Sequence, residues 1–252
     1  MPETSPRSLA AALRARQSVP DLCFDRVYPA HVRVVSARYW TPVHVALLGA
    51  GWLRGAGCQR LLDVGAGPGK FCIVSCLAAG CSTLGIEQRP QLVELARAAA
   101  CAYEAQADFE LGTIEQIDPD RFDAWYFYNP FGENAYDGAD RFDNTVELSD
   151  ARCARDLTIV EGWLDRAARG TCVLTYHGFG GRMPDTYALV RRQYVHGGEL
   201  RLWIKRRPGR AQGFSMELGE SIYSSEQLEA MAPRLSASCH RRVRELLARP
   251  FT

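Results

Sequence analysis

The chain has 252 residues, of which 47 % are hydrophobic and 23 % charged, and its formal net charge at pH 7 is +1. This composition is typical of a globular protein with one large domain and excludes a disordered chain, a collagen-like repeat and a coiled coil. The small net charge does not indicate a nucleic-acid-binding protein, and no apolar run approaches the roughly 20 residues of a membrane-spanning helix.

Residues 1–56 are expected to form a helical cap. Their clearest helix is the apolar stretch at residues 43–53. Thr41 followed by Pro42 fits an N-cap and a first-turn proline for this helix.

Residues 57–206 alternate short apolar runs with longer periodic segments, which is typical of repeated β-α units. Strands are expected at residues 60–64, 82–86, 108–111, 122–128 and 171–176. Helices are expected at residues 70–79, after Pro90, and from the cap Ser149 to about residue 167. Residues 187–195 and 199–205 flank His196-Gly-Gly198, which predicts a hairpin. We therefore expect a doubly wound α/β fold with a seven-stranded, mostly parallel sheet whose last strand is antiparallel.

The tail at residues 207–252 is expected to hold one helix, around residues 225–232, and then a basic stretch that includes Arg241, Arg242 and Arg244. Positive charge of this kind attracts anionic partners or RNA. No aromatic residues are interleaved for stacking on bases, so we do not expect a nucleic-acid partner.

The nine cysteines include no C-x-x-C pair, and most of them lie in apolar runs. The first residues do not read as a secretory signal, because Arg14 and Arg16 interrupt their apolar stretch. These features predict reduced, buried thiols in a cytoplasmic protein.

The segment Asp63-Val-Gly-Ala-Gly-Pro-Gly69 follows an expected strand and opens an expected helix. Glycine allows a sharp turn and a close approach to a ligand, and the helix N-terminus suits an anionic group. A phosphate-binding P-loop does not fit, because Val64 and Phe71 occupy the positions of its first glycine and its hydroxyl. A dinucleotide fingerprint would need its third glycine at Lys70.

The pattern D-x-G-x-G-x-G, with Glu87 at the end of the next strand, resembles the class I methyltransferases that use S-adenosylmethionine. The resemblance covers roughly residues 57–206 and includes the expected strand order with its closing antiparallel hairpin. It implies that the glycine turn passes beneath the methionine part of the cofactor, that Asp63 helps to hold its amino group, and that Glu87 binds both ribose hydroxyls. The cofactor contacts that it implies are Asp63, Gly65, Ala66, Gly67, Gly69, Glu87, Gln88, Thr113, Ile114 and Asn129.

One position departs from the family. Thr113 stands where these enzymes usually carry an acidic residue near the adenine amino group. Thr113 and Ile114 are still expected to line the adenine pocket through backbone N–H groups and apolar contact. The resemblance also implies a lid over the cofactor and substrate, and its candidate contacts are Tyr28, Tyr39, Trp40 and Thr41.

The fourth strand ends at Asn129-Pro130-Phe131, which resembles a shortened [D/N]-P-P-[Y/F] motif of methyltransferases that act on amino or amide nitrogen. The resemblance implies that Asn129 and a backbone carbonyl accept hydrogen bonds from the target N–H, while Phe131 packs on the target. Pro130 is the only proline of this motif, and a simple turn after a buried strand is the alternative interpretation. Methyl transfer of this kind is an in-line displacement, so positioning and desolvation supply much of the acceleration.

Two further features concern the methyl acceptor. Six acidic residues between Glu133 and Asp150 would attract a cationic amine, unless this is simply a solvated loop. His177 is the candidate general base if the acceptor is a hydroxyl, and a structural histidine is the alternative. His31 and His44 show no metal-ligand spacing, so no metal is predicted.

The sequence therefore predicts a methyltransferase that uses S-adenosylmethionine and acts on an amine of a small molecule or a protein. An O-methyltransferase based on His177 is the alternative within this class. An NAD-linked oxidoreductase and a non-catalytic cofactor-binding subunit are alternatives from other classes. No membrane association and no particular oligomeric state are predicted.

Overall fold

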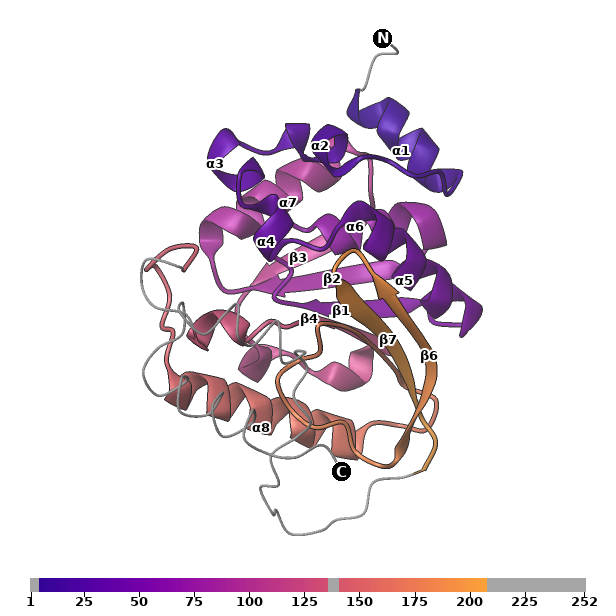
Figure 1. Ribbon diagram of the computed structural model, residues 1–252, viewed down its shortest axis with the longest axis vertical. Coiled ribbons are helices and arrows are strands. Elements are labelled where there is room, and N and C mark those ends of the chain that lie inside the picture. Colours follow the sequence, from indigo (N-terminus) through magenta and orange to yellow (C-terminus); the bar gives the residue numbers. More distant parts are fainter. Residues whose placement is uncertain (1–4, 136–140, 208–252) are drawn as a thin grey trace.

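The computed structural model describes residues 5–135 and 141–207, in which a central sheet carries helices on both faces (Figure 1). The helix expected around residues 225–232 and the basic stretch after it lie outside the described residues. Within the described ranges, no helix is long and apolar enough to cross a membrane.

The seven strands form one sheet in the order β3-β2-β1-β4-β5-β7-β6. Neighbouring strands pair in parallel except β7, which is antiparallel to both β5 and β6. The expected fold class is confirmed, and this is the topology that the resemblance to class I methyltransferases implies. The strands are β1 (Arg60–Val64), β2 (Ser82–Glu87), β3 (Ala107–Leu111), β4 (Ala124–Tyr128), β5 (Cys172–Tyr176), β6 (Tyr187–Val195) and β7 (Gly198–Lys205).

The hairpin between β6 and β7 is closed by the two residues His196 and Gly197. Both have left-handed backbone conformations, with φ of +54° and +79°. Two such residues in succession give a turn whose twist matches that of the flanking strands. The hairpin that the sequence predicted is therefore confirmed.

Four helices of ten or more residues accompany the strands in the described ranges. The helices α5 (Val43–Gly55), α6 (Lys70–Ala79) and α7 (Pro90–Ala102) cover one face of the sheet, and α8 (Asp150–Arg166) covers the other (Figure 1). Gly80 ends α6 with φ of +70°, and the Ser149 hydroxyl caps α8 by accepting from the backbone N–H of Arg152 at 3.1 Å. Both ends lie where the sequence placed them.

The connection between β3 and β4 differs from the repeated β-α pattern. It contains the short 3-10 turns η2 (Ile114–Gln116) and η3 (Pro119–Arg121) and no α-helix. The Gln116 side chain accepts from the backbone N–H of Thr113 at 2.9 Å, which closes a single turn locally, and Pro119 starts the next one.

The expected N-cap at Thr41 is wrong. Pro42 occupies the N-cap position, and the Asp21 carboxylate accepts from the backbone N–H of Val43 at 3.0 Å. The Thr41 hydroxyl instead pairs with the Tyr126 hydroxyl of β4 at 2.8 Å. A side chain from a distant segment has therefore replaced the local cap.

The N-terminal segment is helical, as expected, and packs over α6 and α7. Its short elements are α1 (Pro6–Arg14), α2 (Asp21–Phe24), η1 (Asp25–Val27), α3 (Ala30–Arg33) and α4 (Ser36–Tyr39). Leu13 and Phe24 belong to the same buried apolar cluster as Cys72 and Leu92 of the sheet-covering helices. Lys70, at the start of α6, is 2 % exposed and forms ion pairs with Asp21 and Asp25, so this segment is fastened directly behind the glycine turn.

Candidate functional site

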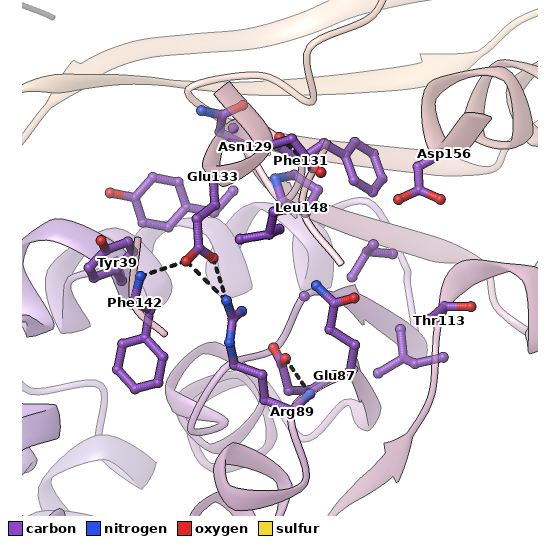
Figure 2. Close-up of a pocket in the computed structure, with 18 of the residues that line it drawn as sticks. Tyr39, Glu87, Arg89, Thr113, Asn129, Phe131, Glu133, Phe142, Leu148 and Asp156 are labelled. Carbon is purple, nitrogen blue, oxygen red and sulfur yellow. Dashed lines mark hydrogen bonds and ion pairs between the residues drawn. The ribbon is translucent and has the colours of Figure 1, made fainter. Parts of the chain in front are cut away.

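A pocket of about 250 Å³ opens at the carboxyl ends of four adjacent strands (Figure 2). Asn129 follows β4, Gly65 follows β1, Glu87 ends β2 and Thr113 follows β3. Ligands of open α/β sheets bind at this edge, where the chain leaves neighbouring strands in different directions. Of the predicted site residues, those that line the pocket are Tyr39, Trp40, Gly65, Glu87, Gln88, Thr113, Ile114, Asn129, Pro130, Phe131 and His177.

The glycine turn needs its glycines for both backbone and space. Gly65, Gly67 and Gly69 have φ of +73°, +55° and +83°, which are left-handed conformations. A Cβ on Gly67 would lie 2.7 Å from the Trp40 ring, and one on Gly69 would lie 2.5 Å from the Phe109 ring. Gly65 lines the pocket, whereas Ala66, Gly67 and Gly69 are not among the lining residues.

Glu87 is buried, and both of its carboxylate oxygens accept backbone N–H groups. One oxygen accepts from Gly67 at 3.0 Å and the other from Arg89 at 2.9 Å. Burial raises the pKa of Glu87, and these hydrogen bonds together with the Arg89 charge oppose that rise. Each oxygen keeps acceptor capacity toward the pocket, so the carboxylate can receive two further donors such as a pair of hydroxyls.

Asp63 lies behind the glycine turn. It is 3 % exposed, does not line the pocket, and accepts a hydrogen bond from the Cys72 thiol at 3.4 Å. Burial, with a smaller contribution from the charge of Glu87, raises the pKa of Asp63 to about 7. The carboxyl group of Asp63 is therefore partly protonated at neutral pH.

Asn129 and His177 directly follow the paired strands β4 and β5, and both have unusual backbone conformations. Their φ values are +38° and +56°, in the left-handed region that costs a residue with a side chain free energy. The Asn129 N–H donates to the Gly178 carbonyl at 2.9 Å, and the His177 ring stacks on Tyr128 with centroids 5.6 Å apart. Burial lowers the pKa of His177, which keeps the imidazole neutral at pH 7. The turns therefore hold both side chains at the pocket.

Arg89 is a pocket residue that sequence reasoning missed. It is 6 % exposed, and it donates to Asp143 at 2.9 Å and to both oxygens of Glu133 at 3.0 Å. Its guanidinium also lies over the Phe142 ring, 5.5 Å from the centroid (Figure 2). The sequence did contain a signal for this role, because Arg89 directly precedes the helix that begins at Pro90. A cation at a helix N-terminus is unfavourable with the helix dipole, which indicates a compensating acidic partner.

The contacts of Arg89 change the interpretation of the acidic residues between Glu133 and Asp150. Glu133 and Asp143 share one buried arginine, so only one of their two negative charges remains uncompensated at the pocket mouth. Two other acidic residues of this loop, Asp137 and Asp140, lie outside the described residues. The charge argument for a cationic substrate is weakened accordingly.

Two of the four lid candidates line the pocket and two do not. Tyr39 and Trp40 line the pocket, and both contact the Phe142 ring, with centroids 6.0 and 5.6 Å away. Tyr28 and Thr41 do not line it. The Tyr28 hydroxyl donates to the Pro68 carbonyl at 2.9 Å, and Thr41 is paired with Tyr126, so both hold the scaffold behind the pocket.

Helix α8 adds two charged residues to the pocket wall, Arg152 and Asp156, which the sequence analysis did not single out. They form an ion pair of 2.9 Å that is largely shielded from solvent, with side chains 13 % and 6 % exposed. Within residues 5–135 and 141–207, no group of three or more His, Cys, Asp or Glu side chains is arranged to hold a metal ion.

No protein-family model and no curated protein sequence matches this chain. Solved structures do match. An RNA methyltransferase from Salinibacter ruber, in complex with S-adenosyl-L-homocysteine, is similar over 71 % of this chain and 99 % of that one, with 19 % identity and a TM-score of 0.48. TrmN from Thermus thermophilus is similar over 73 % of this chain and 53 % of that one, with 15 % identity and a TM-score of 0.48, so this chain spans about half of it. Because these likenesses are distant, we infer function from the residues of this chain.

Proposed function

We propose that this protein is an enzyme that transfers a methyl group from S-adenosylmethionine. The observation that carries the proposal is the order of groups along one pocket: Asn129, Gly65, Glu87 and Thr113 at the ends of β4, β1, β2 and β3. This order matches a ligand with a reactive end, a ribose and a base. Glu87 suits the ribose because its free acceptor positions complement two hydroxyl donors.

The residues present fit the charge of this cofactor as well. Bound in this pocket, S-adenosylmethionine supplies an electrophilic methyl group on a positively charged sulfur. Asp63 and Glu87 place two buried carboxylates beside the glycine turn, and Gly65 allows the backbone to approach the ligand. Tyr39, Trp40 and Phe142 form an aromatic wall that excludes water from the reacting groups.

We favour a nitrogen acceptor, held at Asn129-Pro130-Phe131. In this proposal the Asn129 side-chain carbonyl accepts a hydrogen bond from the acceptor N–H and directs the nitrogen lone pair toward the methyl group. The strained backbone of Asn129 and its bond to Gly178 limit how the side chain can move. The acceptor is then an amine or amide of a small molecule or a protein.

A hydroxyl acceptor is the second candidate, and the neutral, buried imidazole of His177 favours it. Because burial lowers the pKa of His177, its ring nitrogen can take a proton from a hydroxyl at neutral pH. Tyr128 stacks on this ring and fixes its plane.

Calorimetric titration with S-adenosylmethionine, S-adenosylhomocysteine and NAD tests the class of ligand. Micromolar binding of the first two and no binding of NAD is the expected result. Binding of NAD alone would refute the proposal and indicate an oxidoreductase. Binding of the adenosyl ligands without transfer to any acceptor would indicate a cofactor-binding subunit.

Transfer of labelled methyl groups to amines, hydroxyl compounds, proteins and RNA then identifies the acceptor. Asn129→Ala is expected to lower the transfer rate while cofactor affinity stays within about 3-fold, since its partner is the acceptor. His177→Ala serves as the matched comparison on the neighbouring strand. A large loss of transfer in His177→Ala and none in Asn129→Ala would replace the nitrogen acceptor with a hydroxyl.

A further inference from the structure

Helix α8 brings a carboxylate to the end of the pocket where β3 terminates. The helix packs against η2, the turn that follows β3, and Arg155 of α8 lies 3.4 Å from Glu115 of η2. One residue further along α8, Asp156 lines the same pocket as Thr113 and Ile114, and Figure 2 shows its carboxylate on the Thr113 side of Phe131. Asp156 therefore lies at the β3 end of the pocket, away from Asn129.

The burial of this carboxylate is costly for a purely structural ion pair. Asp156 is 4 % exposed, and Arg152 Nε contacts its two oxygens at 3.0 and 2.9 Å. Taking two charges out of water costs free energy that the mutual attraction of a buried ion pair often does not repay. The ion pair therefore adds little to stability at this position.

The Asp156 oxygens keep capacity for a ligand. An ionised carboxylate has about four acceptor positions, and the single N–H of Arg152 Nε occupies the region between the two oxygens. Arg152 is itself placed by the Ser149 cap, whose hydroxyl accepts the Arg152 backbone N–H at 3.1 Å. The carboxylate is thus oriented by its own helix and can accept from a donor in the pocket.

The neighbouring side chains indicate which donor this is. Ile114 and Phe131 line the pocket and belong to one apolar cluster, and they give this end of the pocket apolar surfaces that suit a planar ring. If Glu87 binds the ribose, the base lies beyond β2, at the end of β3. An adenine base presents an amino group at position 6, whereas a hypoxanthine or guanine base presents a carbonyl oxygen there.

We propose that Asp156, oriented by Arg152, accepts a hydrogen bond from the 6-amino group of the adenine base and selects adenine over 6-oxo purines. The inference rests on the proposed function, because it takes the ribose to be at Glu87. It assigns adenine recognition to α8 and not to the residues after β3, where Thr113 offers no carboxylate. A 6-oxo purine would bring a carbonyl oxygen against the carboxylate and lose binding through repulsion.

Calorimetry with S-adenosylhomocysteine and S-inosylhomocysteine, which differ at position 6 and in the protonation of N1, tests the inference. The native protein is expected to bind the adenine compound at least about 10-fold more tightly. In Asp156→Asn this ratio is expected to fall below about 3-fold, because an amide can accept from an amino group or donate to a carbonyl oxygen. Arg155→Gln, which removes the exposed ion pairs with Glu115 and Glu147 and leaves the carboxylate of Asp156 in place, is the matched control and should keep the native ratio.

Three results would overturn the inference. Equal affinity of the native protein for both compounds would overturn it. This first result needs no variant, so it can be obtained even if Asp156→Asn fails to fold. A native ratio in folded Asp156→Asn would assign the selection to another group, such as a backbone N–H at Thr113. Failure of the native protein to bind either compound, or S-adenosylmethionine, would refute the proposed function itself.

Discussion

The ion pairs of Lys70 allow a quantitative test of how the N-terminal segment is held over the glycine turn. Lys70 is 2 % exposed, and its ammonium lies 2.5 Å from Asp21, 2.8 Å from Asp25 and 3.3 Å from the Ser36 hydroxyl. Asp25 is itself only 4 % exposed. Lys70→Met keeps the apolar stem of the side chain and removes the ammonium group, with its charge and its hydrogen bond to Ser36.

The expected cost follows from the carboxylate that remains. Asp21 keeps its bond to the Val43 N–H and is partly exposed, so it tolerates the loss. Asp25 becomes a buried charge without its lysine, and breaking such a pair from one side costs about 3–5 kcal/mol. At the usual entropy of unfolding for a chain of this size, the melting temperature should fall by roughly 10 °C.

Urea denaturation of the native protein, Lys70→Met and Lys70→Met/Asp25→Asn measures this cost. The double variant has no unpaired carboxylate at residue 25 and should recover at least half of the loss. Arg7→Met is the control, because its pair with Glu104 is exposed and should change the free energy of unfolding by less than about 0.5 kcal/mol. A loss below about 1 kcal/mol in Lys70→Met, or no recovery in the double variant, would refute the reasoning.

Three further predictions concern the glycine turn and the carboxylates beside it. Glu87→Gln should weaken binding of S-adenosylmethionine about 10- to 100-fold in calorimetry, through lost charge-assisted hydrogen bonds, and unchanged affinity would exclude Glu87 as a ligand. The pKa of Asp63 is about 7 in the folded protein and 3.8 in the unfolded chain, so the folded state binds this proton more tightly. The free energy of unfolding should therefore fall as the pH rises from about 4 to 7. Asp63→Asn should remove this loss, which is at most roughly 4 kcal/mol at about 1.4 kcal/mol per pH unit, and equal pH profiles of the urea midpoint would contradict it. Gly67→Ala should destabilise the protein by more than Gly80→Ala, since both have positive φ but only a Cβ at Gly67 would meet Trp40, and equal melting temperatures would show that this contact yields freely.

Short-range chemistry explains the parts of the fold that the sequence predicted well. These parts are determined by residues that lie within one helical turn or one strand of each other. They are the apolar strands, the end of α6 at Gly80, the cap of α8 at Ser149 and the turn at His196-Gly197. The connection between β3 and β4, where the sequence analysis placed no helix, is likewise set locally by the turns that begin at Thr113 and Pro119. Where a neighbour from a distant segment competed, as at Thr41, the local expectation failed.

The sequence by itself determined the class of the sheet, the position of the glycine turn and the placement of Glu87 at the end of the second strand. These follow from apolar periodicity and from the backbone freedom of glycine, which need no partner from elsewhere in the chain. Only the tertiary structure decided which charges meet: Arg89 pairs with residues 44 and 54 positions away, and α8 brings Asp156 to the end of β3. Electrostatic partners depend on burial and on distances between elements, and neither quantity is encoded in the spacing of residues along one segment.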